Sequence, residues 1–272
     1  MMKLMKRIVL SRKGFDSVAG GVASPIFADE KIFSIPIPQK SKSPHKYSDL
    51  KFNNLSGGDI LKESSVKSVT VNNYCHYDPL LTEKIGIFGQ VSASQTELRS
   101  NNVGIGDIFL FFGWFKQYSK KGKDLHHLFG WLQIEKIIES QKEIIEYLKN
   151  IKIKHPHGSE GILKLPNNTI YIARKNLVID KNLLPLKGFG LFKKMHSDLI
   201  LTQENCSRSK WKLPKKYFAH TKNIFLNRLK WKDEKNCTLN CVGQGQEYIL
   251  NAEDNPKIIE WVLQLIKNHG QN

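Results

Sequence analysis

Two apolar runs joined by a lysine-rich loop constrain the fold of this chain more than any other feature. The first run, Ile108 to Phe112, is continuous, of strand length and rich in aromatic residues, which favours a strand buried on both faces over a helix. The second run extends from Leu128 to Ile134, and the polar loop between them covers Lys116 to Lys123. Gly106-Asp107, just before the first run, permits a tight turn in which the aspartate accepts hydrogen bonds from local backbone N–H groups. Together these features predict a long antiparallel hairpin.

Patterns elsewhere predict both strands and helices. We expect further strands at residues 6–10, 32–38, 170–173 and 247–250. The second of these should be an edge strand, because each of its prolines removes a ladder donor.

Three helices are predicted from capping and periodicity. Ser-x-x-Glu patterns at Ser94 and Ser140 predict helices over about 95–100 and from residue 140 onward. A C-terminal helix is expected to be capped by Asn255, to have Pro256 in its first turn and to end at Gly270. No repeat or linker is evident, so one compact α+β domain over residues 1–272 is the simplest organisation.

The formal net charge of +17 indicates a polyanionic partner, and nucleic acid is the commonest one in solution. Only six of the 42 basic residues are arginines, however, and a lysine excess of this kind is also typical of AT-rich genomes. Both interpretations remain open. No apolar run is long enough for a signal peptide or a membrane span, and the four cysteines contain no Cys-x-x-Cys pair. We therefore expect a cytoplasmic protein with reduced thiols and no membrane partner.

Basic and aromatic side chains alternate in the segment that follows residue 207. Cations contact phosphates and flat rings stack on bases, so this mixture is typical of single-strand binding, although a solvated lysine-rich face would also explain the charges. The candidate nucleic-acid contacts are Lys13, Gln95, Trp114, Trp131, Arg208, Lys210, Trp211 and Lys212.

Polar side chains in the predicted loops are candidates for catalysis. Arg12, beside glycine-rich turns, could hold a phosphate, although neither a P-loop nor a dinucleotide-binding pattern is present. His155 and His157 could supply two metal ligands, but no acid stands at ligand spacing, so we expect no metal, and polar surface is the simpler interpretation. Asp78 could be a turn cap instead of an acid or base. The candidate catalytic residues are Arg12, Asp16, His76, Asp78, His155, His157 and Glu247.

The hairpin and several other blocks resemble the third of the nucleotide-modification-associated domain families. The hairpin contributes residues 104–115 and 129–134 to this likeness. The other blocks are residues 11–16, Gly20-Gly21, 24–26, 76–79, 88–90, 155–157, 207–211, 243–247 and Trp261. The resemblance covers nearly the whole chain. It implies bacterial or phage systems that modify nucleic-acid bases, without defining a reaction or a cofactor.

The pattern of a strand that follows Gly-Asp and a return strand that begins with glycine also resembles the one found in PUA-like barrels, including the ASCH and EVE groups. This likeness implies an α+β fold with a mixed, mainly antiparallel, barrel-like core, flanking helices and a C-terminal helix. Trp114 and Trp131 would then be candidates for stacking on a base, and the alternative is that both belong to the core. Two functions remain open: a base-modification enzyme acting on a nucleotide or a base, in DNA more than RNA, and a non-catalytic reader of modified DNA or RNA.

Overall fold

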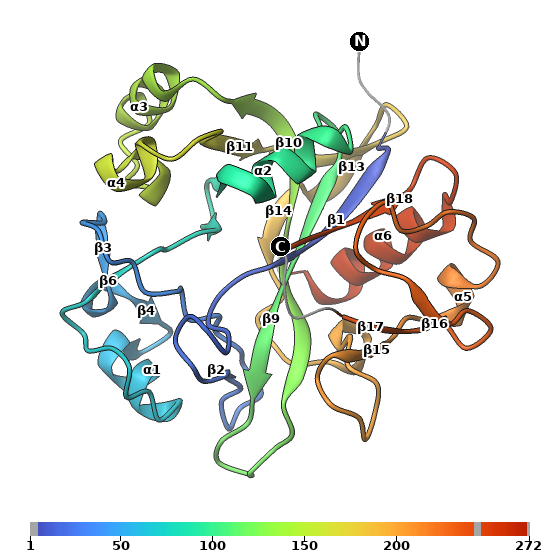
Figure 1. Cartoon of the computed structure of the whole chain (residues 1–272), viewed down its shortest axis with the longest axis horizontal. Coiled ribbons are helices and arrows are strands. Elements are labelled where there is room, and N and C mark those ends of the chain that lie inside the picture. Colours follow the sequence, from blue (N-terminus) through green and yellow to red (C-terminus); the bar gives the residue numbers. More distant parts are fainter. Residues whose placement is uncertain (1–4, 242–245, 271–272) are drawn as a thin grey trace.

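A nine-stranded mixed sheet forms the centre of the molecule in the computed structural model, which describes residues 5–241 and 246–270 (Figure 1). Its strands are β1 (Arg7–Arg12), β2 (Ser24–Pro25), β7 (Leu80–Leu81), β8 (Gly86–Gln90), β9 (Ile108–Lys116), β10 (Leu125–Ile138), β11 (Thr169–Ala173), β14 (Phe189–Leu191) and β18 (Glu247–Asn251). Their order is β18-β1-β9-β10-β11-β8-β7, with β14 beside β10 and β2 beside β9. Most neighbours are antiparallel, whereas β1 and β2 run parallel to β9.

The predicted hairpin is confirmed as β9 and β10, which pair from Ile108 opposite Gln133 to Phe115 opposite Leu125. The turn before β9 also follows the prediction. Asp107 accepts hydrogen bonds from the N–H of Gly104 at 2.8 Å, and also from the N–H groups of Lys6 and Arg7 at 2.8 and 2.9 Å. The same carboxylate therefore joins the start of β1 to the start of β9. Burial raises the pKa of Asp107 to about 6.

The expected barrel is not formed. The path of paired strands has two ends, β18 and β7, which do not pair with each other in the described part of the chain. Strand β7 has only two residues, and its one ladder is with β8. The sheet therefore stays open.

Six α-helices and three 3-10 segments surround the sheet in the described ranges. They are α1 (Gly57–Glu63), α2 (Ser92–Ser100), α3 (Gln141–Asn150), α4 (Glu160–Leu163), α5 (Lys215–Phe218), α6 (Lys257–His269), η1 (Tyr47–Asp49), η2 (Pro156–Gly158) and η3 (Ser197–Leu199). None of these helices is long and apolar enough to cross a membrane.

The three predicted helices are present, with two corrections at their starts. Ser140 accepts from the N–H of Glu143 and caps α3 as expected. Helix α2 begins at Ser92, two residues before Ser94, and its N-cap makes no side-chain bond. Asn255 does not cap α6, because its side chain bonds instead to the backbone of Lys222 and Asn251.

The strands predicted at residues 6–10, 170–173 and 247–250 are confirmed as β1, β11 and β18, whereas the edge strand at 32–38 is wrong. That segment makes only isolated bridges, at Ile32 and Pro38, since its prolines cannot donate to a ladder.

The remaining short strands form small sheets: β3 (His45–Lys46) with β6 (Tyr74–Cys75), β4 (Lys51–Phe52) with β5 (Leu55–Ser56), β12 (Asn176–Ile179) with β13 (Asn182–Lys187), and β15 (Lys210–Lys212), β17 (Thr238–Asn240) and β16 (Trp231–Asp233) in that order.

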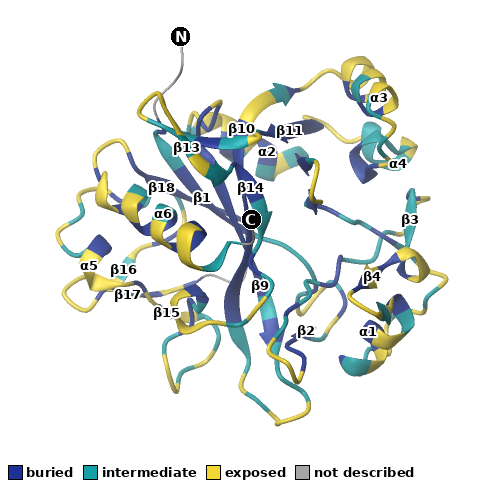
Figure 2. Ribbon diagram, turned by 180° about the vertical axis from the view of Figure 1, so that it is seen from behind, coloured by how far each residue is buried: buried dark blue, intermediate teal, exposed yellow. Residues whose placement is uncertain are grey.

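Both faces of the central strands are buried, as the aromatic run predicts (Figure 2). Alternate residues of β9 enter different clusters: Leu110 and Phe112 pack with α6, whereas Phe109 and Phe111 pack with Phe88 and the β11 side of the sheet. In Figure 1, α6 and the β15–β17 sheet lie on one side of the long hairpin, and α1 with the β3–β6 pair lies on the other. The hairpin thus lies between two groups of elements (Figure 1). The main cavity described below is lined partly by residues 37–40, His76 and Asp78, which adjoin the β3–β6 pair.

Candidate active site

A cavity of about 650 Å³ lies where the end of β1, the end of β8 and the start of α2 meet several loops. Lys13 follows β1, Gly89 and Gln90 end β8, and residues 92–94 begin α2. The sequence-predicted residues that line this cavity are Arg12, Lys13, Asp16, His76, Asp78 and His157. Segments far apart in the chain therefore contribute to one wall.

The carboxylate of Asp78 is the centre of the polar cluster, and its side chain is only 2% exposed. Its Oδ1 accepts from the N–H of Gly89 at 3.0 Å and lies 3.0 Å from His155 Nε2. Its Oδ2 lies 3.8 Å from the Nε2 atoms of both His76 and His157. The turn-cap interpretation is wrong, because these partners come from β8 and from two loops instead of the local backbone.

The three histidines of this cluster are held neutral by their surroundings. Burial lowers the pKa of His76 and His155 to about 3 and that of His157 to about 4, although the Asp78 charge opposes the shift for His76 and His157. Burial also raises the pKa of Asp78. His155 and His157 are both buried, so their interpretation as polar surface is wrong.

A second polar group surrounds Glu247, the residue opposite Ser11 in the β1–β18 ladder. Its Oε1 accepts from Ser11 Oγ at 3.1 Å, Lys13 Nζ at 2.9 Å and Gln90 Nε2 at 2.6 Å. Its Oε2 is buried and has no hydrogen-bond partner among the described residues. Since Lys13 and Gln90 also line the cavity, Glu247 is connected to it through these two side chains.

The guanidinium of Arg12 lies between this cavity and a second one of about 560 Å³, and it lines both. Its Nη2 donates to Tyr248 Oη at 2.7 Å and to Cys241 Sγ at 3.0 Å. Asp16 also lines both cavities, and its Oδ1 accepts from the N–H groups of Val18 and Ala19. Arg12 is thus held in place at the junction of the two cavities.

Trp114 and Arg208 belong to the second cavity. The guanidinium of Arg208 lies 4.0 Å from the centre of the Trp114 ring, and the indole N–H donates to Asp124 at 2.8 Å. One face of Trp114 is therefore covered by a cation in this structure.

Several other candidates lie away from both cavities. Trp131 is 1% exposed and donates to the carbonyl of Lys187, and Trp211 is fully buried and donates to His126. Gln95 is buried and accepts from Tyr171 Oη at 2.9 Å. These three side chains have core positions. Lys210 and Lys212, by contrast, are exposed on β15.

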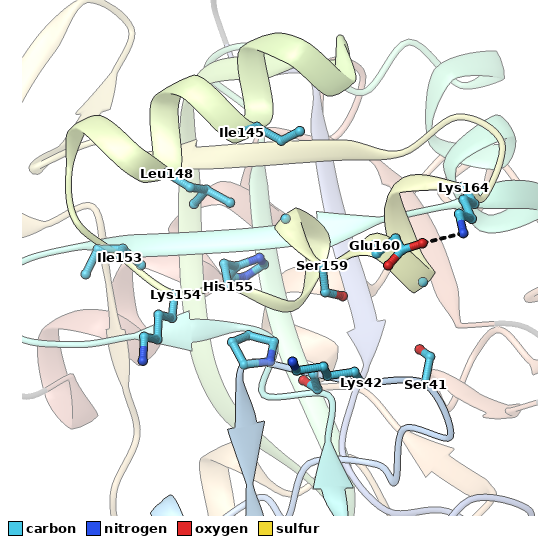
Figure 3. Close-up of a pocket in the computed structure, with 14 residues that line it drawn as sticks. Ser41, Lys42, Ile145, Leu148, Ile153, Lys154, His155, Ser159, Glu160 and Lys164 are labelled. Carbon is cyan, nitrogen blue, oxygen red and sulfur yellow. Dashed lines mark hydrogen bonds and ion pairs between the residues drawn. The ribbon is translucent and has the colours of Figure 1, made fainter.

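His155 lines another cavity, of about 600 Å³, between α3, α4 and the segment 41–44 (Figure 3). The charged side chains there are exposed, including the ion pair between Glu160 and Lys164 at 2.6 Å. His155 therefore lines a different cavity, and it contacts the polar cluster through Asp78 and His157.

Two groups of side chains in the described ranges could hold a metal ion. His76, Asp78 and His157 form one, and His196, Asp198 and His269 form the other; within each group the ligand atoms lie within 4.8 Å of one another. The first lines the main cavity and is largely buried, whereas the second is largely exposed.

Two residues of the cluster carried no recognisable sequence signal. Gln39 Oε1 lies 3.0 Å from His76 Nδ1, and Asn168 Oδ1 lies 2.6 Å from His157 Nδ1. They are 37 and 11 residues from these partners in the chain, so spacing could not reveal them. Gln90 could have been found, because it belongs to the 88–90 block of the family resemblance.

The chain thus has an α+β fold whose open mixed sheet brings a His–Asp cluster and basic side chains to one cavity. The sequence model of nucleotide modification associated domain 3 matches residues 7–251, and the chain belongs to that family. The comparisons with curated proteins and with solved structures gave no match. The family resemblance is thus confirmed, whereas the likeness to PUA-like barrels has no structural support. Residues 243–245 of its C-terminal block lie outside the described residues.

Proposed function

We propose that this protein is an enzyme that modifies a nucleotide or a nucleic-acid base, and that the 650 Å³ cavity is its active site. The observation that carries the proposal is the convergence of His76, Asp78 and His157 with Arg12 and Lys13 on one wall. These residues come from three segments that are far apart in the sequence, and a packed core alone does not require the segments to meet. The nucleotide-modification context of the family supports the same conclusion.

The arrangement fits an anionic ligand with a reactive end. Arg12 supplies a cation for a phosphate, and Lys13, which also pairs with Glu247, adds a second donor at the cavity. The His–Asp cluster that lines the same cavity supplies groups that bind or move protons at the base or sugar. The volume lies within the roughly 300–1,000 Å³ that small-molecule sites usually have.

We prefer DNA as the substrate because Arg12 and Asp16 line both cavities, which places the second cavity next to the first. It adds Lys123 and the Trp114–Arg208 pair, which are side chains suited to phosphates and to a base next to the reacting one. An extruded base in the first cavity would leave its neighbours along the second. The net charge of +17 favours such a polyanion.

The direct test is a mass-spectrometric comparison of DNA nucleosides from the native host with and without the gene. We expect deletion to remove a modified nucleoside, wild-type protein and Asp198→Asn to restore it, and Asp78→Asn to fail. Asp198 is an exposed acid far from the cavity lining, which makes it a matched control. Unchanged nucleosides after deletion would refute the proposal.

A non-catalytic reader is the second candidate, and the Trp114–Arg208 pair beside Arg12 is the observation that favours it. A reader would bind modified DNA more tightly than unmodified DNA, with strong salt dependence and no turnover. Trp131 offers it no open face, since that ring is in the core. Fluorescence anisotropy with both kinds of DNA distinguishes the two functions.

The organisation as one domain over residues 1–272 remains part of the proposal. It is supported by the ladder between β1 and β18, which joins the two ends of the chain in one sheet.

A further inference from the structure

We infer that His76 Nε2, Asp78 Oδ2 and His157 Nε2 bind one divalent transition-metal ion at the wall of the main cavity. The inference rests on the proposed function only for the use of this cavity as the active site. The binding itself follows from the hydrogen bonds around the three side chains, and it can be measured without any substrate.

The bonds of Asn168 determine which nitrogen of His157 carries the proton. Asn168 Nδ2 lies 3.0 Å from the carbonyl oxygen of His157, which can only accept, so the amide nitrogen faces that carbonyl. The amide oxygen then faces His157 Nδ1 at 2.6 Å, and Nδ1 must be the donor. In the neutral ring, Nε2 is left with a lone pair directed toward Asp78.

The same reasoning applies to His76. Gln39 Nε2 faces the carbonyl oxygen of Lys42 at 3.4 Å, so the amide oxygen of Gln39 is the atom that meets His76 Nδ1 at 3.0 Å. His76 Nδ1 donates, and its Nε2 also carries a lone pair toward Asp78.

The other oxygen of Asp78 is already occupied. His155 Nδ1 accepts from the N–H of His157 at 3.4 Å, so His155 Nε2 carries the proton that it donates to Asp78 Oδ1 at 3.0 Å. The N–H of Gly89 is shared between Oδ1 at 3.0 Å and Oδ2 at 3.2 Å. Oδ2 is therefore the atom that faces the two bare imidazole nitrogens.

Asp78 Oδ2 thus lies 3.8 Å from each of the two imidazole nitrogens, and all three atoms lie within 4.8 Å of one another. Among the described residues, the only donor to any of these three atoms is the N–H of Gly89, which Oδ2 shares with Oδ1. A cation bound among these atoms would give each of them a partner. A metal bound at about 2.0–2.2 Å separates neighbouring ligand atoms by about 3–3.5 Å. The two separations of 3.8 Å from Asp78 Oδ2 would therefore shorten by about half an ångström on binding. The second hydrogen bond on each ring orients these ligands in the way that protein metal sites usually do.

The ligand set selects the class of metal. Two imidazole nitrogens and one carboxylate oxygen suit zinc, iron(II), cobalt(II) or manganese(II), whereas calcium and magnesium prefer all-oxygen sites. Three protein ligands beside an open cavity leave positions for water or substrate, as catalytic sites do and closed structural sites do not.

The test is calorimetric titration of chelator-treated full-length protein with Zn²⁺ and with Co²⁺. It uses Asp198→Asn as the parent, which removes the carboxylate of the exposed second cluster. We expect one equivalent to bind, and His76→Ala or Asp78→Asn to weaken binding at least 100-fold. His76 is the safer substitution for folding, because its side chain is 18% exposed. Circular dichroism of the metal-free variants establishes that they fold.

A positioning variant makes the test more specific. Gln39→Leu removes the acceptor for His76 Nδ1 and leaves all three ligands in place, so binding should weaken about 10-fold. A protein that binds no equivalent of either metal would overturn the inference. A second result would also overturn the inference: Asp198→Asn alone binds no metal, whereas Asp78→Asn alone still does. The metal would then bind at the exposed cluster.

The two proposals fail separately. Unchanged nucleosides after gene deletion, together with one bound equivalent, would refute the proposed function and leave the metal site standing. A lost nucleoside without any bound metal would refute the metal site alone.

Discussion

Replacement of Gly89 by alanine perturbs the polar cluster without removing any of its ionisable groups. Gly89 lies in β8, where its backbone pairs with Ile170 and its N–H donates to Asp78. Its φ is not in the left-handed region, so alanine can adopt the same backbone conformation. Only the space occupied by the new methyl group decides the effect.

The structure indicates the size of that effect. A Cβ at position 89 would lie 2.2 to 2.4 Å from atoms of the His157 ring, whereas ordinary contacts begin at 3.4 Å. The ring must therefore shift by about 1 Å, and its bond to Asn168 and its burial oppose this movement. Overpacking of this kind costs about 1–3 kcal/mol in the free energy of unfolding, and a misplacement of about 1 Å at a reacting group costs about 100-fold in rate.

Urea unfolding and the yield of the modified nucleoside in a deletion host measure the two consequences. Gly58→Ala is the matched control, because the nearest atoms to its Cβ are 3.6 Å away, and stability should stay the same or rise slightly. Gly89→Ala with wild-type stability and wild-type nucleoside yield would show that the cavity does not depend on the position of His157.

Three further results are expected. Lys13→Met leaves the buried carboxylate of Glu247 without its cation, so the free energy of unfolding in urea should fall by about 3–5 kcal/mol. Adding Glu247→Gln in the same chain should restore most of this loss. A loss below about 1 kcal/mol in Lys13→Met alone would contradict the prediction. Burial lowers the pKa of His126 to about 3 and that of His127 to about 4. Below about pH 6.5 each ring takes up a proton in the unfolded chain but not in the folded one, so each should lower the free energy of unfolding by about 2 kcal/mol at pH 5. This pH slope should be smaller in His127→Gln, and an unchanged slope counts against the argument. Trp131→Ala should cost about 3–5 kcal/mol in thermal or urea unfolding and leave DNA affinity unchanged in the fraction that folds.

The predictions that the structure confirms are those that depend on neighbouring residues. The β9–β10 hairpin follows from two apolar runs around a polar loop, and the Asp107 turn follows from Gly-Asp. The sequence-based strands at 170–173 and 247–250 are correct for the same reason. The barrel prediction failed because closure depends on which distant edges pair, and β7 is too short to extend the sheet toward β18.

The sequence was enough to predict the hairpin, three of the six helices in the described residues and the types of side chain available to the site, because hydrophobic periodicity and turn chemistry act over a few residues. Contacts between distant segments, in contrast, place Asp78 between His76, His155 and His157 instead of leaving it to cap its own turn. Tertiary packing also decided that Trp131 is in the core. The physical reason is that the register of β8, β11 and β1 sets which loop ends meet, and that register is set by packing over the whole sheet.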